Sequence, residues 1–170
     1  ADTPSKFMLS HFWNLLNQGE DTITVKIAQP YSFNVNQTLW GGNLTMINQL
    51  IGTPYLPNIE GGILFLEDIN EHPYRIERNL YQLRDAGILE KQSAILLGQF
   101  NGFQLYDSDA GYDFGAMVEH FRSRCDVPIL TGLPYGHVRE KVTLPVGQRA
   151  LLNVNGEAGF ELVVRAIRCV

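Results

Sequence analysis

The sequence predicts an α/β domain with a small parallel sheet in its middle and an antiparallel meander at its C-terminal end. Three continuous apolar runs alternate with two segments of helical periodicity, a pattern typical of parallel strands joined by helices. Towards the C-terminus, strand-like runs at residues 141–147, 149–155 and 160–166 follow one another closely, with turn residues between them. The chain has 170 residues, of which 45% are hydrophobic, so one domain can bury a sizeable core.

The first third of the chain predicts a helix, a strand and a second helix. Residues 5–18 are followed directly by a glycine, as expected of a helix that ends there. Residues 22–29 alternate between apolar and polar side chains, which indicates a strand exposed on one face. Further on, the pair Gly41 and Gly42 predicts a tight turn that leads into a short helix over residues 43–51.

The middle of the chain predicts three strands and two helices in alternation. Apolar runs at residues 61–68, 93–100 and 126–133 are bounded by turn residues and suit strands buried on both faces. Residues 72–89 and 112–125 carry apolar side chains at helical spacing. Because strand–helix–strand connections are right-handed, we expect the three strands to be parallel and the helices to cover them.

Composition argues against several classes of function. The formal net charge is −5 and no basic stripe is present, which argues against a nucleic-acid partner. No apolar run is long enough to cross a bilayer, and no signal-peptide pattern opens the chain. The two cysteines, Cys125 and Cys169, cannot form a disulfide scaffold or a metal-binding knuckle. We expect no cofactor and no bound metal.

Polar side chains follow two of the three buried strands. Glu67 and Asp68 end the first strand, and the turn that carries His137 follows the third. Sites gather at the carboxyl ends of parallel strands, so a carboxylate and an imidazole would meet there if the strands are neighbours. A carboxylate that accepts the Nδ1–H of a histidine fixes its tautomer, and the other nitrogen can then carry a proton from a nucleophile to a leaving amine.

Two other interpretations of these residues remain open. Residue types alone favour a plainer one, in which Glu67 caps the next helix and His137 is a solvated loop residue. The other is a metal site formed by Glu67, Asp68, Glu71 and His72, although their spacing matches no established ligand motif.

The sequence offers no clear nucleophile to accompany this pair. The chain contains no G-x-S-x-G elbow. Ser108 lies in a turn context, but the neighbouring aspartates would raise the cost of an alkoxide, so a solvated turn is the better interpretation. Cys125 follows Arg122 and Arg124, which could lower the pKa of its thiol, yet it leads into a core strand. We expect a buried structural thiol.

Several segments between about Thr38 and Gly147 resemble the LD-carboxypeptidases, the serine peptidase family that also contains the microcin C7 self-immunity peptidases. They occur in the family's order and at matching intervals, and they read LWGGNLTMINQLIGTPYLP, GILFLEDINEHPYRIERNLYQLRDAGIL, AILLGQF and VPILTGLPYGH…VTLPVG. The resemblance implies that residues 1–170 form one C-terminal domain of the three-layer swivelling β/β/α type. It also implies that the N-terminal domain, which carries the family's nucleophile, is absent.

The family uses a Ser-His-Glu triad to release D-alanine from the murein tetrapeptide L-Ala-D-Glu-meso-DAP-D-Ala during peptidoglycan recycling. By the motif match, the glutamate of FLED is Glu67 and the histidine of PYGH is His137, with Glu71 as the nearest alternative to Glu67. The resemblance implies that the serine and the oxyanion-hole donors belong to the N-terminal domain, so this chain alone should be inactive. Ser108 with Asp109 superficially mimics the family's serine–aspartate pair, but it belongs to a different loop.

Other functions and partners stay open beside this expectation. The chain could be a non-catalytic binding or dimerisation module, or a microcin C7-type self-immunity peptidase domain that acts on a peptide–nucleotide antibiotic. Family members commonly form homodimers, and apolar side chains of the first helix could contribute to an interface or to the core; they are Phe7, Phe12, Trp13 and Leu16. The resemblance implies the bacterial cytoplasm, with the periplasm as the alternative.

Overall fold

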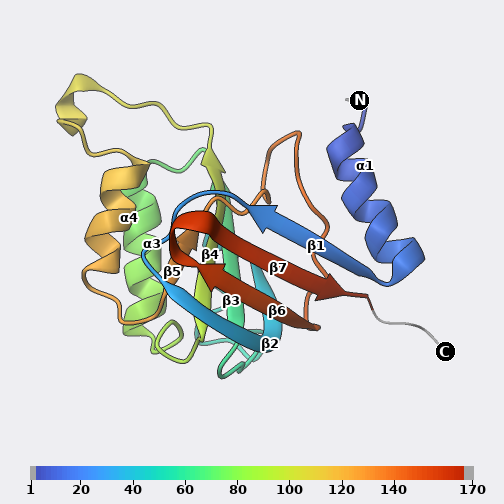
Figure 1. Cartoon of the computed structure of the whole chain (residues 1–170). Coiled ribbons are helices and arrows are strands. Elements are labelled where there is room, and N and C mark those ends of the chain that lie inside the picture. Colours follow the sequence, from blue (N-terminus) through green and yellow to red (C-terminus); the bar gives the residue numbers. More distant parts are fainter. Residues whose placement is uncertain (1–2, 167–170) are drawn as a thin grey trace.

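The computed structural model describes residues 3–166 and contains one continuous sheet flanked by helices (Figure 1). The strands are β1 (Glu20–Val25), β2 (Ser32–Asn43), β3 (Ile63–Ile69), β4 (Ala94–Asn101), β5 (Ile129–Thr131), β6 (Arg149–Asn155) and β7 (Gly159–Arg165). The helices are α1 (Lys6–Trp13), α2 (Leu44–Gln49), α3 (Pro73–Asp85) and α4 (Phe114–Arg122), and the single helical turns are η1 (Asn14–Gln18), η2 (Asp107–Asp109) and η3 (Gly156–Ala158).

The sheet has an antiparallel half and a parallel half, in the strand order β1-β7-β6-β2-β3-β4-β5. Strands β1, β7, β6 and β2 pair antiparallel, whereas β2, β3, β4 and β5 pair parallel. The expected parallel core of strands with an antiparallel elaboration is therefore confirmed. The antiparallel half is built from β6 and β7 together with β1 and the first half of β2.

Strand β2 joins the two halves. Its residues 32–38 pair with β6, and its residues 39–43 pair with β3. The tight turn expected at Gly41 and Gly42 is wrong, because both glycines lie inside β2. A Cβ on Gly41, at φ +141°, would lie 1.9 Å from the carbonyl oxygen of Phe65 on β3. The glycine therefore permits a close approach of two parallel strands, which a local turn signal does not reveal.

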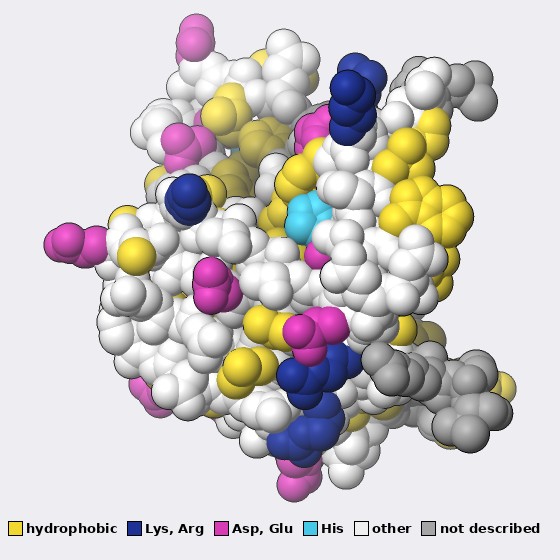
Figure 2. Space-filling model, turned by 45° about the vertical axis from the view of Figure 1, so that its right-hand side comes forward, with side chains coloured by type: hydrophobic (Ala, Val, Ile, Leu, Met, Phe, Trp, Pro, Cys, Tyr) yellow, Lys and Arg dark blue, Asp and Glu magenta, His cyan; other side chains and the backbone are white. Residues whose placement is uncertain are grey.

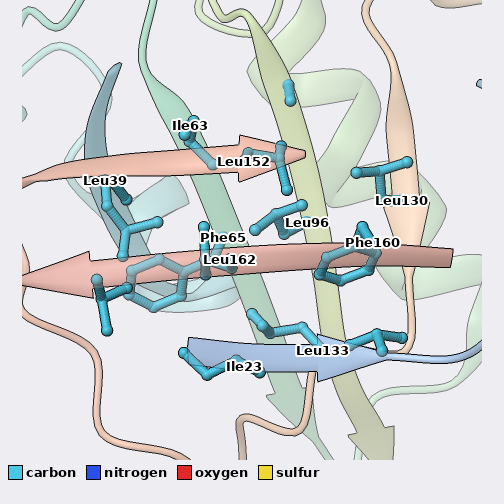
Figure 3. Close-up of a cluster of buried hydrophobic side chains, with 14 of the residues drawn as sticks. Ile23, Leu39, Ile63, Phe65, Leu96, Leu130, Leu133, Leu152, Phe160 and Leu162 are labelled. Atoms are coloured by element: carbon cyan, nitrogen blue, oxygen red, sulfur yellow. The ribbon is translucent and has the colours of Figure 1, made fainter. Parts of the chain in front are cut away.

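The two faces of the parallel strands carry separate cores. Helices α2, α3 and α4 cover one face, where the residues expected to face inward, Ile76, Leu80 and Leu83, are buried with the side chain of Trp40. The antiparallel half crosses the other face, and Figure 3 shows its side chains, such as Leu152 and Phe160, meeting Phe65 and Leu96. These layers are the expected β/β/α arrangement.

Residues 141–147 were expected to form a strand, but they belong to the irregular connection between β5 and β6. Val142 is buried, and its N–H donates to the carbonyl of Pro134 at 2.8 Å. The segment thus carries the apolar pattern of a strand because Val142 is anchored in the core. Its last residue, Gly147, donates its N–H to the carbonyl of Leu39 on β2 at 2.8 Å, but the segment belongs to no strand.

Helix α1 lies at the edge of the molecule and begins at the cap residue Ser5, whose Oγ accepts the N–H of Met8 at 3.0 Å. Its side chains divide between the core and the surface. Phe7 packs against the core, whereas the apolar side chains on the outer side are between 36% and 50% exposed; they are Leu9, Phe12 and Trp13. Leu16, in the following turn η1, is 56% exposed. No helix within residues 3–166 is long and apolar enough to cross a membrane.

Candidate active site

Glu67 and His137 meet at the carboxyl-end edge of the parallel sheet. Glu67 lies near the end of β3, and His137 lies in the loop that follows β5, on the other side of β4. His137 Nδ1 lies 2.9 Å from Glu67 Oε2. Because an ionised carboxylate can only accept a hydrogen bond, Nδ1 is the donor in this contact, and in a neutral ring Nε2 is then the proton acceptor. The structure thus brings together the two residues that the sequence singles out.

The two side chains differ in exposure. The side chain of Glu67 is 6% exposed, whereas that of His137 is 52% exposed. A buried, hydrogen-bonded carboxylate orients the imidazole, and the accessible half of the ring can reach a reacting group that approaches from outside. This division is what a histidine acting as a general base requires.

Alternation along β3 separates the roles of Glu67 and Asp68. Phe65 belongs to the core under the antiparallel half, and Leu66 belongs to the core under the helices. Since side chains alternate along a strand, Glu67 continues the first series and Asp68 the second. The carboxylate of Asp68 accepts hydrogen bonds from the backbone N–H and the hydroxyl of Thr45, at 2.9 and 2.7 Å. Asp68 therefore fixes the start of α2 and points away from His137.

Hydrogen bonds from a β-bulge in β4 hold the loop that carries His137. Beside Glu67, β4 contains one residue more than β3 does. In this bulge, Gln99 donates its backbone N–H to the carbonyl of Tyr135 at 2.8 Å and its side-chain Nε2 to the carbonyl of Leu133 at 3.1 Å. Gly98 permits the approach, because a Cβ there would lie 2.5 Å from the Tyr135 carbonyl oxygen. Bulges of this kind commonly re-aim groups next to active sites.

Asn101 and Tyr135 complete the support of His137. Asn101 Nδ2 donates to the backbone carbonyl of His137 at 2.9 Å. The ring of Tyr135 packs edge-on against Phe65, with centroids 4.9 Å apart. Burial raises the pKa of the Tyr135 phenol, and the nearby charge of Glu67 raises it further. Sequence analysis missed both residues, and the only signal was the position of Tyr135 in the PYGH motif.

The side chains of the four residues considered as metal ligands form contacts with four different partners and do not converge. Glu71 Oε2 lies 3.8 Å from a guanidinium nitrogen of Arg75, and His72 Nε2 lies 3.1 Å from Asp109 Oδ2. Glu67 contacts His137 and Asp68 contacts Thr45, as described above. Within residues 3–166, no three His, Cys, Asp or Glu side chains are grouped so as to hold a metal ion.

Neither candidate nucleophile is hydrogen-bonded to the ring of His137 or lines a hollow that it borders, among the described residues. Ser108 is exposed in η2, in the loop between β4 and α4, and no hydrogen bond among the described residues joins it to the ring of His137. Burial raises the pKa of the Cys125 thiol, which keeps the thiol protonated near neutral pH. The thiol is half-buried, in agreement with a structural role.

His137 borders two hollows on one side of the molecule. The first, of about 400 Å³, is also lined by Glu67. The second, of about 510 Å³, is also lined by Arg139. Met8 and Lys141 line both hollows, so α1 forms part of their wall. Figure 2 shows hydrophobic side chains gathered on this side of the molecule. A larger hollow, of about 700 Å³, lies over β1, β6 and β7 and borders neither member of the pair.

Comparisons with known proteins agree with this architecture. The family model described as LD-carboxypeptidase C-terminal domain matches residues 37–152. The murein tetrapeptide carboxypeptidase of Pseudomonas aeruginosa is 33% identical over 122 residues, which are 71% of this chain and 39% of that protein. The crystal structure of muramoyltetrapeptide carboxypeptidase from Oxalobacter formigenes is 49% identical with a TM-score of 0.88, and the match covers 95% of this chain and 55% of that one.

A more distant solved structure shares the fold. It is that of the protein MccF in complex with glutamyl sulfamoyl guanosine, at 21% identity and a TM-score of 0.76, and it covers 94% of this chain and 55% of that one. The chain therefore spans about half of the solved chains that it resembles, and about two-fifths of the Pseudomonas protein.

Proposed function

Because the chain belongs to the LD-carboxypeptidase family, whose C-terminal domain it matches, we propose that it supplies the histidine and the glutamate of a serine-type peptidase. The observation that carries the proposal is the 2.9 Å contact between His137 Nδ1 and Glu67 Oε2. In the proposal, the serine and the oxyanion-hole donors come from an N-terminal domain that completes the site. His137 and Glu67 are then the catalytic residues of this chain.

The proposed reaction uses His137 as a proton carrier. As the serine Oγ attacks the scissile carbonyl, Nε2 of His137 takes the hydroxyl proton, and Glu67 stabilises the imidazolium that forms. When the tetrahedral intermediate collapses, the imidazolium gives that proton to the leaving amine, and D-alanine departs. A water molecule then attacks the acyl-enzyme with His137 again as the base, which regenerates the serine.

The substrate that we propose is the murein tetrapeptide L-Ala-D-Glu-meso-DAP-D-Ala, cut before its last residue. The names of the relatives support it: a murein tetrapeptide carboxypeptidase at 33% identity and a muramoyltetrapeptide carboxypeptidase at 49% identity. The likeness to the microcin-type protein is weaker, at 21% identity. Such a reaction serves peptidoglycan recycling, which would place the protein in the bacterial cytoplasm.

The test is D-alanine release from this tetrapeptide by two proteins. One is the chain alone, which we expect to be inactive. The other is a chimera in which the chain replaces the matching 55% of the Oxalobacter enzyme, and which we expect to be active. In the chimera, His137→Ala and Glu67→Gln should each lower kcat by roughly 10⁴-fold, because triad members act as a unit. Glu71→Gln is the matched control and should retain activity.

Two outcomes would count against the proposal. A chimera that melts like the parent enzyme but releases no D-alanine would show that these residues do not complete the triad. Release by the chain alone that His137→Ala abolishes would place the nucleophile within these 170 residues, and Ser108 would then be the first residue to test.

A further inference from the structure

Two cations beside His137 have no carboxylate partner among the described residues. Lys141 lines both hollows that His137 borders, and Arg139 lines only the second. Neither forms an ion pair within residues 3–166, whereas Arg75 and Arg122, for example, each lie next to a glutamate. Glu140 lies between the two cations in the sequence and Glu67 lines the first hollow, but neither carboxylate forms an ion pair with Arg139 or Lys141 among the described residues, so both cations are free to bind an anion.

The backbone beside Lys141 is held in place. The next residue, Val142, is 4% exposed and belongs to the core under the antiparallel half. Its N–H donates to the carbonyl of Pro134 at 2.8 Å. Lys141 itself is exposed and lines the hollows, so its ammonium group sits on a flexible stem that extends from a fixed point.

The chemistry of the proposed reaction places an anion close to His137. To give its proton to the leaving amine, His137 Nε2 must come within about 3 Å of that nitrogen. In a C-terminal amino acid the carboxylate carbon is two bonds from the nitrogen, so the carboxylate oxygens lie within about 4 Å of it. The C-terminal carboxylate must therefore enter the space that His137 borders.

We propose that Lys141 binds the C-terminal carboxylate of the peptide substrate and so selects chains that end one residue after the scissile bond. The inference rests on the proposed function and deepens it, since it names the group that distinguishes a carboxypeptidase from an endopeptidase. Lys141 is preferred to Arg139 because it alone of the two also lines the hollow that contains Glu67. It is a specificity-determining residue and takes no part in proton transfer.

The first experiment uses the active chimera and two substrates, the tetrapeptide and its C-terminal carboxamide. Lys141→Met should lower kcat/KM for the carboxylate about fivefold or more, chiefly through KM, and should leave kcat/KM for the carboxamide unchanged. Lys6→Met, which removes an exposed lysine outside both hollows, is the matched control and should change neither. The proposal is overturned if Lys141→Met lowers kcat/KM equally on both substrates. It is also overturned if Arg139→Met shows the loss confined to the carboxylate substrate and Lys141→Met does not.

The second experiment tests Lys141 without catalysis. The chain alone is titrated with N-acetyl-D-alanine or N-acetyl-D-alaninamide, and the NMR signals of the Lys141 side chain and the His137 ring are followed. The carboxylate should give saturable shifts with a Kd on the order of 10 mM, and the amide should give none. Loss of these shifts in Lys141→Met supports the proposal. An inactive chimera would count against the proposed function but would leave this binding result standing. Equal shifts with both probes, or none with either, reject it.

Discussion

At the scale of single residues, the candidate site depends on the contrast between a fixed carboxylate and an accessible imidazole. Glu67 is almost fully buried, and the loop that carries His137 is bonded at several points to β4. A base held this way loses little freedom when a substrate arrives, because its rotamer and tautomer are already set. The proposed activity therefore also depends on Gln99 and Asn101, which hold the loop in place.

The charge of Glu67 can be measured through its effect on Tyr135. Burial is the larger cause of the raised pKa of Tyr135, and Glu67 adds to it because a negative charge opposes ionisation of the phenol. We expect Glu67→Gln to lower the pKa of Tyr135 while leaving it above the ordinary value of about 10. An NMR titration of the Tyr135 ring carbon measures the change, with Glu71→Gln as the control. An unchanged pKa in Glu67→Gln would contradict the geometry of the site.

The sequence predicts the members of the pair but not their support. The ends of parallel strands share an edge, which makes Glu67 and His137 candidates, but residue types alone favour a capping and a solvated role, and the FLED and PYGH motifs are what select the pair. Gln99 and Asn101 cannot be predicted in the same way, since their roles arise from a bulge and from bonds to an irregular loop. Such contacts depend on tertiary packing, which leaves no periodicity in the chain.

At the scale of secondary-structure elements, β2 connects the antiparallel and the parallel half of the sheet, because it pairs with a strand of each half. The change of partner from β6 to β3 occurs between Thr38 and Leu39. Composition predicts a turn at the following glycine pair because glycine is common in turns, but here one glycine serves close strand packing. The same limit applies to residues 141–147, where Val142 is buried in the core outside any strand and Val146 is 59% exposed.

Substitutions at the glycine pair separate strand packing from backbone strain. Both glycines have positive φ, at +141° for Gly41 and +148° for Gly42, but only Gly41 has a backbone atom in the space of a Cβ. Gly42→Ala should cost about 1–2 kcal/mol of unfolding free energy from strain alone. Gly41→Ala should cost at least about 2 kcal/mol more, because β2 and β3 must separate. Urea unfolding followed by circular dichroism measures both, and equal losses would refute this account of β2.

At the scale of the whole molecule, the two cores share one sheet, so most of the chain should unfold as a single unit. Strands β3 and β4 contribute side chains to both cores, and β2 continues across both halves. Helix α1 is the exception, because none of its residues from Lys6 to Trp13 is buried. It is attached by the packing of Phe7 against the core and by the side chain of Asp21 on β1, whose carboxylate oxygens lie 2.5 Å from His11 Nδ1 and 3.1 Å from Asn14 Nδ2.

This difference predicts two classes of amide in hydrogen exchange. Amides of β3 and β4 should exchange only through global unfolding, whereas those of α1 should exchange at least roughly 100-fold faster through local opening. Asp21→Asn removes the charge that holds His11 and should speed exchange in α1 by about tenfold more, with β3 unchanged. Ser10→Ala, which removes a hydroxyl bonded only within α1, is the control. Met8 of α1 lines both hollows beside His137, so local opening of α1 would also widen these hollows. Amides that exchange at the same rate in α1, β3 and β4 would contradict this prediction.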